Sequence, residues 1–426
     1  MSHFSYHAGS LHAEATPLSS IAEQFGTPTY VYSKAALLAN FGAYAKACEG
    51  RDALVCYAMK ANSNLAILDL LAREGAGFDI VSGGELLRVL AAGGDAGKVI
   101  FSGVGKSVAE MRLALSHDIL CFNVESIPEL HRLNEVAGSM GKVARISLRV
   151  NPNVDAKTHP YIATGLKANK FGVAFDDALA TYRTAAALPH LDVAGIDCHI
   201  GSQLLDDAPL LEALDRLIEL IDTLHDEGIV LHHLDIGGGL GINYGEAGEA
   251  APVAVGDYLG RLFKRIDAWR AARYDGMPVK VIFEPGRSII GDVGLLLTRV
   301  EYLKPGAEKN FCVVDAAMND LMRPALYQAW MDVQAVEPRD ADSAIYDIVG
   351  PICESGDWLA RERALALAPG DLLAIMQAGA YGLTMSSNYN TRGRAAEVLV
   401  DGEQLHLIRR REEPAELFAI ETMLPR

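Results

Sequence analysis

The first residue whose type and position suggest chemistry is Lys60. It ends a short apolar run at 54–59, and the residues that follow, 61–64, are typical of a turn that leads into a helix. A run of this length predicts a strand buried on both faces of a parallel sheet. Lys60 would then lie at the carboxyl end of that strand, where α/β folds bind ligands. A partly desolvated lysine can act there as a neutral nucleophile and form a Schiff base, although a solvated lysine at a strand end is the plainer alternative.

Two glycine-containing turns could bind an anion. Glycines 237–239 directly follow an apolar run, and Gly201 and Ser202 follow His199. Glycines let backbone N–H groups approach a phosphate closely. Each turn could equally be a plain tight turn, and His199 a hydrogen-bonded core histidine. A dinucleotide fingerprint is not present, because it would need a third glycine at Ile242.

The segment after the last apolar run combines a carboxylate with a guanidinium. Glu284 ends the run, and a turn through Pro285 and Gly286 would bring Arg287 to the same mouth. These two groups would suit a cation and an anion, unless they simply pair with each other on a loop. A Schiff-base lysine, two phosphate-binding turns, an imidazole and a carboxylate are together what pyridoxal 5'-phosphate requires of a protein.

Eight short apolar runs and the helical patterns between them would position these groups. The runs are 53–59, 78–81, 98–101, 119–122, 143–150, 193–198, 230–236 and 279–283. The helical patterns are 65–73, 85–92, 108–116, 128–137, 176–187, 209–227 and 255–274. This alternation predicts a closed parallel (β/α)8 TIM barrel, with an open doubly wound sheet as the alternative. Polar residues at the run ends favour the barrel: Lys60, Asp79, Ser82, Ser102, Gly103, Asn123, Glu125, Arg149, Asn151, His199, Asp235 and Glu284.

The pattern changes after about residue 290. Strand-like segments linked by Gly, Pro and Asp turns predict a mostly antiparallel β domain, sandwich-like or barrel-like, which the early strand 29–32 would join. These segments are 295–303, 310–314, 344–349, 371–376 and 397–400. We therefore expect a cofactor-binding barrel at 34–289 and a β domain built from 1–33 and 290–426.

Composition limits the classes of function. The chain of 426 residues has a formal net charge of -17, which argues against a nucleic-acid partner and against an anionic membrane surface. Its six cysteines are scattered without metal-ligand spacing, as expected of a reduced cytoplasmic protein with no metal site. No signal-peptide pattern and no membrane-length apolar run is expected.

Seven strings, in order, carry a resemblance to a known family. YAMKANSN, DCHIGSQ, DIGGGLGI and FEPGR resemble the barrel decarboxylases of the alanine racemase type, which use pyridoxal 5'-phosphate. MNDLMRPALY (318–327), GPICESGDWLA (350–360) and GAYGLTMSSNYN (379–390) narrow the resemblance to the diaminopimelate decarboxylase family. It extends over nearly the whole chain. It implies decarboxylation of meso-2,6-diaminopimelate to L-lysine and CO2, the last step of lysine biosynthesis, by a homodimer with shared active sites.

The resemblance also implies roles for the matching positions. Lys60 would bind the cofactor covalently, His199 would stack on its ring, and Glu284 would face the ring nitrogen. The phosphate would be held by Ser202, Gly239 and the backbone of Gly286 and Arg287, with Tyr381 also touching it. Gly238 and Pro285 would bind the cofactor as well. The retained end of the substrate would be bound by Arg287, Arg323, Tyr327, Glu354 and Tyr381. Cys353 would protonate the carbon that has lost CO2.

The substrate's chemistry agrees with these roles. Meso-diaminopimelate has two amino-acid ends, and the retained one needs a cation for its carboxylate and an anion for its ammonium, as Arg323 and Glu354 would supply. A decarboxylase of ornithine, arginine or carboxynorspermidine is the alternative enzyme, but such polyamine-type substrates have little use for Arg323. A regulator built on the same fold is the alternative from another class. It could dispense with Lys60 or Cys353, and both are present.

Overall fold

The structure is a computed structural model that describes residues 3–155, 170–273 and 279–426. The chain divides into two compact units. The barrel unit comprises Phe41–Ile242 and Ala251–Ser288. The β unit comprises Met1–Asn40, Asn243–Ala250 and Ile289–Arg426.

Within the described residues, eight parallel strands form a closed ring in the barrel unit. Each pairs with its neighbour in the order β5-β6-β7-β8-β9-β11-β12-β13, and β13 pairs with β5. A short strand, β10 (Val173–Ala174), pairs with the end of β9. The ring strands are β5 (Ala53–Ala58), β6 (Gly77–Ile80), β7 (Val99–Phe101), β8 (Cys121–Val124), β9 (Ala144–Asn151), β11 (Leu191–Asp197), β12 (His233–Asp235) and β13 (Lys280–Phe283). The predicted TIM barrel is confirmed.

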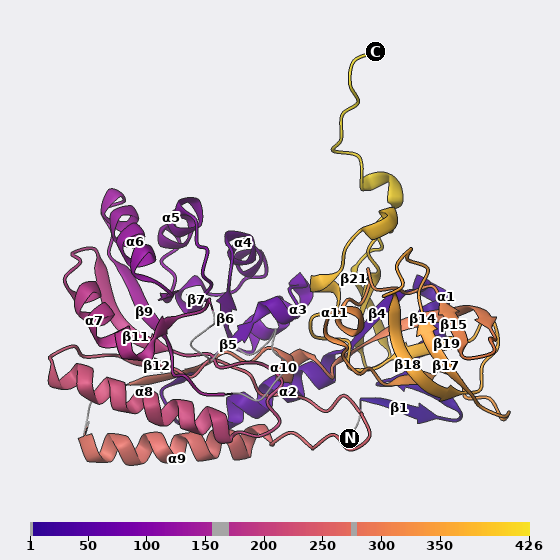
Figure 1. Cartoon of the computed structure of the whole chain (residues 1–426), viewed down its shortest axis with the longest axis horizontal. Coiled ribbons are helices and arrows are strands. Elements are labelled where there is room, and N and C mark those ends of the chain that lie inside the picture. The colour runs from indigo at the N-terminus through magenta and orange to yellow at the C-terminus, as the bar shows by residue number, and fades with distance from the viewer. Residues whose placement is uncertain (1–2, 156–169, 274–278) are drawn as a thin grey trace. The chain divides into compact units, whose positions relative to one another are not determined.

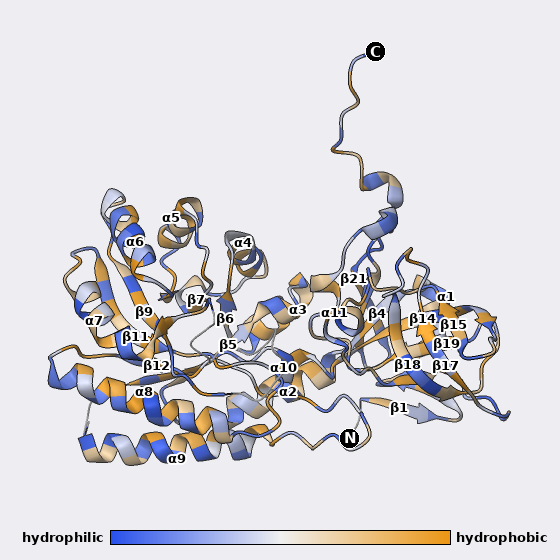
Figure 2. Cartoon of the chain, viewed as in Figure 1, coloured by the Kyte–Doolittle hydropathy of each residue, from blue (hydrophilic) through white to orange (hydrophobic). Residues whose placement is uncertain are grey.

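Helices between the strands follow the predicted pattern closely. They are α3 (Leu65–Arg73), α4 (Gly83–Ala91), α5 (Val108–Ser116), α6 (Ile127–Ser139), α7 (Phe175–Ala186), α8 (Ala208–Asp226) and α9 (Val255–Arg273). The last predicted residue of the final helix, Tyr274, lies outside the described residues. Apolar and polar residues alternate along α8 and α9 (Figure 2), because one face of each is buried.

Side-chain caps fix where several βα loops end. Asn64 accepts a hydrogen bond from the amide of Ala66, and Ser82, Ser107 and Ser126 cap α4, α5 and α6 in the same way. Each cap satisfies a backbone N–H that the helix itself leaves without a partner. In the parts of the chain that the structure describes, no helix combines the length and apolar character needed to cross a bilayer.

The β unit is built on a mostly antiparallel sheet with the order β18-β17-β15-β14-β4-β20-β21, and β19 pairs with both β14 and β16 (Figure 1). β4 (Thr29–Ser33) lies between β14 and β20, so the expectation that the early strand joins this sheet is confirmed. The other strands are β14 (Gly294–Lys304), β15 (Asn310–Val314), β16 (Val333–Ala335), β17 (Ala344–Val349), β18 (Trp358–Leu365), β19 (Leu372–Ile375), β20 (Ala396–Asp401) and β21 (Gln404–Arg409).

Shorter elements complete the described chain. A separate three-stranded sheet near the N-terminus consists of β1 (Phe4–His7), β2 (Ser10–Ala13) and β3 (Thr16–Pro17). The remaining α-helices are α1 (Leu18–Phe25), α2 (Lys34–Ala47), α10 (Arg287–Ile290) and α11 (Arg323–Tyr327). The predicted early strand 29–32 corresponds to β4. No pattern in the sequence predicts β1–β3, β16, β18 or β21.

Candidate active site

Lys60 lies at the carboxyl end of the barrel and pairs with a buried carboxylate. It belongs to a single 3-10 turn, η1 (Met59–Ala61), directly after β5. Its Nζ is 2.9 Å from Oδ2 of Asp79, whose side chain has no exposure, whereas the Lys60 side chain is 38% exposed. Because β5 and β6 are neighbours, with Ala58 paired to Asp79, the register of the barrel brings the amine to this carboxylate. The amine is therefore both oriented and accessible.

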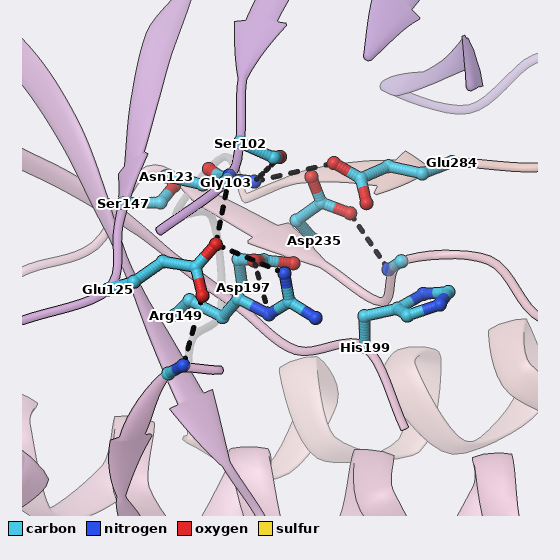
Figure 3. Close-up of polar contacts among 12 residues, drawn as sticks. Ser102, Gly103, Asn123, Glu125, Ser147, Arg149, Asp197, His199, Asp235 and Glu284 are labelled. Atoms are coloured by element: carbon cyan, nitrogen blue, oxygen red, sulfur yellow. Dashed lines mark hydrogen bonds and ion pairs between the residues drawn. The ribbon is translucent and has the colours of Figure 1, made fainter. Parts of the chain in front are cut away.

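Three more acidic residues form the floor of the site. Asp197, Asp235 and Glu284 come from the ends of three neighbouring strands, and all are buried. One carboxyl oxygen from each lies within 4.8 Å of those of the other two. Asn123 donates to Oε1 of Glu284 at 3.3 Å, and the amide of Gly237 donates to Oδ1 of Asp235 at 2.9 Å (Figure 3).

The three carboxyl groups of the floor do not all ionise easily at the same time. Burial first, and then the negative charge of Asp235, raises the pKa of Glu284 and of Asp197 well above the ordinary range. Burial, together with the charge of Asp79, raises the pKa of Asp235 to about 7. Neighbouring carboxylates in a dry site cannot all ionise unless a cation joins them. The floor therefore favours either bound protons or a positively charged group.

An arginine network forms one wall of the site. Arg149 on β9 donates to Oε1 of Glu125 at 3.3 Å, and its Nε lies 3.9 Å from Oδ2 of Asp197 (Figure 3). Glu125 also accepts hydrogen bonds from the amides of Gly103, at 2.9 Å, and Gly172, at 3.0 Å. Arg149 is only 7% exposed. Its charge is therefore held in place by neighbours on several strands.

His199 is held as a neutral imidazole. Its Nδ1 accepts the amide hydrogen of Gly238 at 3.2 Å, so this ring nitrogen carries no proton in that hydrogen bond. Burial, followed by the positive charges of Arg149 and Lys60, lowers the pKa of His199 well below its ordinary value. A neutral ring with one nitrogen fixed is suited to stacking on a flat aromatic group.

The glycines predicted to bind phosphate are required by close backbone contacts. A Cβ on Gly238 would clash with the carbonyl oxygen of Glu284. A Cβ on Gly239, whose φ is +119°, would lie 2.5 Å from the carbonyl oxygen of Gly201. The loops after β11, β12 and β13 are therefore packed backbone against backbone, as a glycine-lined phosphate site requires.

Ser202 and Arg287 lie on the same side of the site. Arg287 is 6% exposed and donates to Oγ of Ser202 from Nε, at 3.3 Å, and from Nη2, at 3.2 Å. A Cβ on Gly286 would lie 3.2 Å from Ala58 and from Ala61, which packs the loop that follows β13 against the turn that carries Lys60. The barrel unit thus brings together Lys60, His199, Ser202, Gly238, Gly239, Glu284, Pro285, Gly286 and Arg287.

This donor set fits pyridoxal 5'-phosphate. Burial and the neighbouring carboxylates raise the pKa of Glu284 although the charge of Lys60 lowers it, and a protonated ring nitrogen would stabilise the ionised carboxylate further. Glycine loops, a serine and an arginine suit a phosphate. Lys60 supplies the accessible amine.

The β unit carries the other predicted residues. Arg323 and Tyr327 are the first and last residues of α11, and Arg323 is 5% exposed. The guanidinium carbon of Arg323 lies 4.4 Å from the ring centroid of Tyr244, which belongs to the same unit. Tyr381 follows β19 with a left-handed φ of 56°. The barrel set and these residues belong to different units of the chain.

Cys353 and Glu354 lie exposed on the loop between β17 and β18. The amide of Cys353 donates to Oδ1 of Asn390 at 3.1 Å, and the hydroxyl of Tyr389 donates to Oε1 of Glu354 at 2.7 Å. The structure therefore joins two of the strings singled out in the sequence, 350–360 and 379–390, at this loop.

Several residues that build the site were given no role from the sequence. The sequence identifies Asp79, Asn123 and Arg149 only as polar residues at strand ends. Tyr389 and Asn390 lie within a string that carried the family resemblance, but their contacts with Cys353 and Glu354 depend on the fold of the β unit. The sequence shows only that these residues lie at strand ends or within a string that carries the resemblance. Such a position marks a residue as a candidate for the site but does not show which residue it contacts.

Comparisons with known proteins agree with this geometry. The family model described as "Pyridoxal-dependent decarboxylase, pyridoxal binding domain" matches residues 34–291. The diaminopimelate decarboxylase of Pseudomonas aeruginosa is 61% identical over 425 residues, which is 100% of both chains.

Two solved structures also resemble the chain. The diaminopimelate decarboxylase of Helicobacter pylori complexed with L-lysine has a TM-score of 0.89 and 41% identity, covering 95% of this chain and 99% of that one. The diaminopimelate decarboxylase of M. jannaschii in co-complex with L-lysine has a TM-score of 0.93 and 37% identity, covering 99% and 98%. The chain belongs to the diaminopimelate decarboxylase family of pyridoxal-dependent decarboxylases.

Proposed function

We propose that this protein decarboxylates meso-2,6-diaminopimelate at its D-configured end, releasing CO2 and L-lysine in the last step of lysine biosynthesis. The observation that carries the proposal is similarity over nearly the full length to diaminopimelate decarboxylases, two of them solved with L-lysine bound. The chemistry of the barrel floor supports it, because a buried acid cluster beside an accessible lysine suits a cationic aromatic cofactor.

In this proposal, residues 34–289 form the domain that binds the cofactor, and residues 1–33 and 290–426 form the β domain. Pyridoxal 5'-phosphate, when bound, supplies an electron sink for the carbon that loses CO2. Lys60 binds it covalently, His199 stacks on its ring, and Glu284 faces its ring nitrogen. Its phosphate is held by Ser202, Gly239, the backbone of Gly286 and Arg287, and Tyr381, while Gly238 and Pro285 also bind the cofactor.

The β domain supplies the residues for the substrate's retained end. Arg323 binds the distal carboxylate together with Arg287, Tyr327 and Tyr381, and Glu354 binds the distal ammonium. The hydrogen bond from Tyr389 supports this role, because it fixes one carboxylate oxygen of Glu354 and leaves the other available. Cys353 donates the proton to the reacting carbon, and its exposed thiol is accessible for this purpose.

We propose further that the protein is a cytoplasmic homodimer. Cys353 and Glu354 lie in the β unit, whereas Lys60 lies in the barrel unit. The family resemblance implies a two-fold dimer in which each site takes its Cys-Glu pair from the partner. Six cysteines without a disulfide support a reducing compartment.

A direct assay tests the proposed function. Purified protein loaded with pyridoxal 5'-phosphate is incubated with meso-diaminopimelate, and L-lysine and CO2 are quantified; ornithine and arginine are assayed in parallel. One L-lysine for each CO2, with little turnover of the other two substrates, is the expected result. Absence of L-lysine, or faster turnover of ornithine or arginine, would refute the proposal. Lys60→Ala serves as the inactive control.

A further inference from the structure

Three segments far apart in the β unit are joined by hydrogen bonds. The amide of Ser387 donates to the carbonyl oxygen of Asn319 at 2.9 Å, which links the segment that follows β15 to the segment that follows β19. The bonds from Cys353 to Asn390 and from Tyr389 to Glu354 link the latter segment to the loop between β17 and β18. Asp357 joins the remaining pair of segments, the one that follows β15 and the loop between β17 and β18.

Asp357 accepts two short hydrogen bonds from different segments. The amide of Met318 donates to its Oδ1 and the amide of Ile352 to its Oδ2, both at 2.7 Å. The side chain therefore bridges the loop that carries Cys353 to the segment that leads into Arg323. Asp357 is 4% exposed, so water competes weakly for these bonds.

The backbone around Asp357 is also closely fixed. Its own amide donates to the carbonyl oxygen of Glu354 at 3.1 Å, which closes the loop on itself. At the start of the loop, a Cβ on Gly350 would lie 2.5 Å from Cβ of Ala317 and 2.6 Å from the carbonyl oxygen of Ala316. The same two segments are thus in contact at a second point, which is independent of the carboxylate.

We propose that Asp357 is a positioning residue that fixes Cys353 and Glu354 relative to the segment that carries Arg323. The proposal rests on the proposed function, in which these three residues act on the substrate. Asp357 itself does not touch the substrate. Its two acceptor oxygens hold the loop that presents Cys353 and Glu354 against the segment that leads into Arg323.

Asp357→Asn is the matched perturbation. Asparagine has the same shape, but one of its two polar atoms is an N–H donor, so either the Met318 or the Ile352 amide would face another donor. Asp347→Asn is the control. Asp347 is a buried acid of β17 that accepts hydrogen bonds from the Glu362 amide, at 2.9 Å, and from Lys309, at 3.0 Å.

The holoenzyme variants are compared by kcat and KM for meso-diaminopimelate, by the absorption of bound cofactor, and by the alkylation rate of the Cys353 peptide with iodoacetamide. We expect Asp357→Asn to lower kcat/KM at least tenfold and to speed alkylation at least threefold, with unchanged cofactor absorption. Asp347→Asn should keep both values within twofold of the parent. Equal alkylation and equal kcat/KM in Asp357→Asn, or the same changes in both variants, would overturn the proposal.

A second measurement needs no variant. Hydrogen exchange on the parent protein should show the Met318 and Ile352 amides protected to a similar degree, although both lie outside helices and strands. Rapid exchange at either amide would overturn the proposal even if Asp357→Asn fails to fold. If the parent produces no L-lysine, the proposed function fails, while alkylation and exchange still decide whether Asp357 fixes the loop.

Discussion

Replacing Asp235 by asparagine should make the free energy of unfolding of the barrel fall less as the pH rises. Asp235 is fully buried, and its Oδ2 has no hydrogen-bond partner among the described residues. Asparagine keeps the acceptor for the Gly237 amide and places a neutral amide near Glu284. The ionisable groups around Asp235 come from several strands: Cys56, Asp79, Cys121, Asp197, Cys198 and Glu284.

The size of the effect follows from the pKa of Asp235. Burial raises this pKa from 3.8 to about 7, a difference of about three pH units. A carboxyl group with a raised pKa stabilises the folded protein below its unfolded pKa, and that contribution is lost as the pH rises through the folded pKa. At 1.36 kcal/mol per pH unit, the free energy of unfolding falls by about 4 kcal/mol over the full range, with somewhat more than half of this between pH 5 and 8. The Asp235→Asn variant lacks this pH-dependent contribution to the free energy of unfolding.

Urea unfolding of the cofactor-free protein measures the difference. Of the three tryptophans, Trp269 lies in the barrel unit, so a background with Trp330→Phe and Trp358→Phe gives a barrel reporter. The advantage of Asp235→Asn over its parent should grow by about 2–3 kcal/mol from pH 5 to pH 8. Asp226→Asn, an exposed carboxyl, controls for the loss of one acid. A constant difference across this range would show that Asp235 is already ionised, and the reasoning about the floor would fail.

Three further predictions concern the proposed site. Borohydride treatment of the yellow holoenzyme should leave a pyridoxyl group on the Lys60 peptide, and a label on a different lysine would contradict that assignment. Arg323→Ala should lower kcat/KM for meso-diaminopimelate by about 30-fold or more, because losing a desolvated arginine–carboxylate contact costs about 2–5 kcal/mol; parental efficiency would exclude Arg323 from substrate binding. Lys60→Ala and Cys353→Ala should each be inactive, yet refolding them together should restore about a quarter of the sites under random two-fold pairing. No recovery would end the shared-site proposal.

The barrel could be predicted almost strand by strand from the sequence. Its runs are short, apolar and buried on both faces, and its helices keep a regular apolar face with a polar cap, so local pattern and tertiary structure agree. The strands of the larger sheet that are not predicted from the sequence lie at its edges or off its main path. β18 and β21 are the two edges of their sheet, and β16 pairs only with β19. An edge strand buries less of its surface, so its sequence is more polar and its pattern weaker.

The site was predictable in part. The chemistry of Lys60 and Glu284 follows from residue type and position at strand ends. The proximity of Asp197 to Asp235 and Glu284 does not, because it depends on strand order and register around a closed ring, which local spacing does not encode. The same holds for Asp357, whose partners come from residues 318 and 352 through the packing of two loops.

The position of β4 has a consequence for the protein's synthesis. This strand leaves the ribosome early, but its two neighbours, β14 and β20, begin only at Gly294 and Ala396. At 5–20 residues per second, β4 must wait roughly 15 to 50 s for β14, and the barrel is translated in that interval. A gene split at the unit boundary near residue 289 would leave the C-terminal product with a gap in the middle of its sheet. A working split or a circular permutation of this chain would have to carry residues 29–33 along with the C-terminal part.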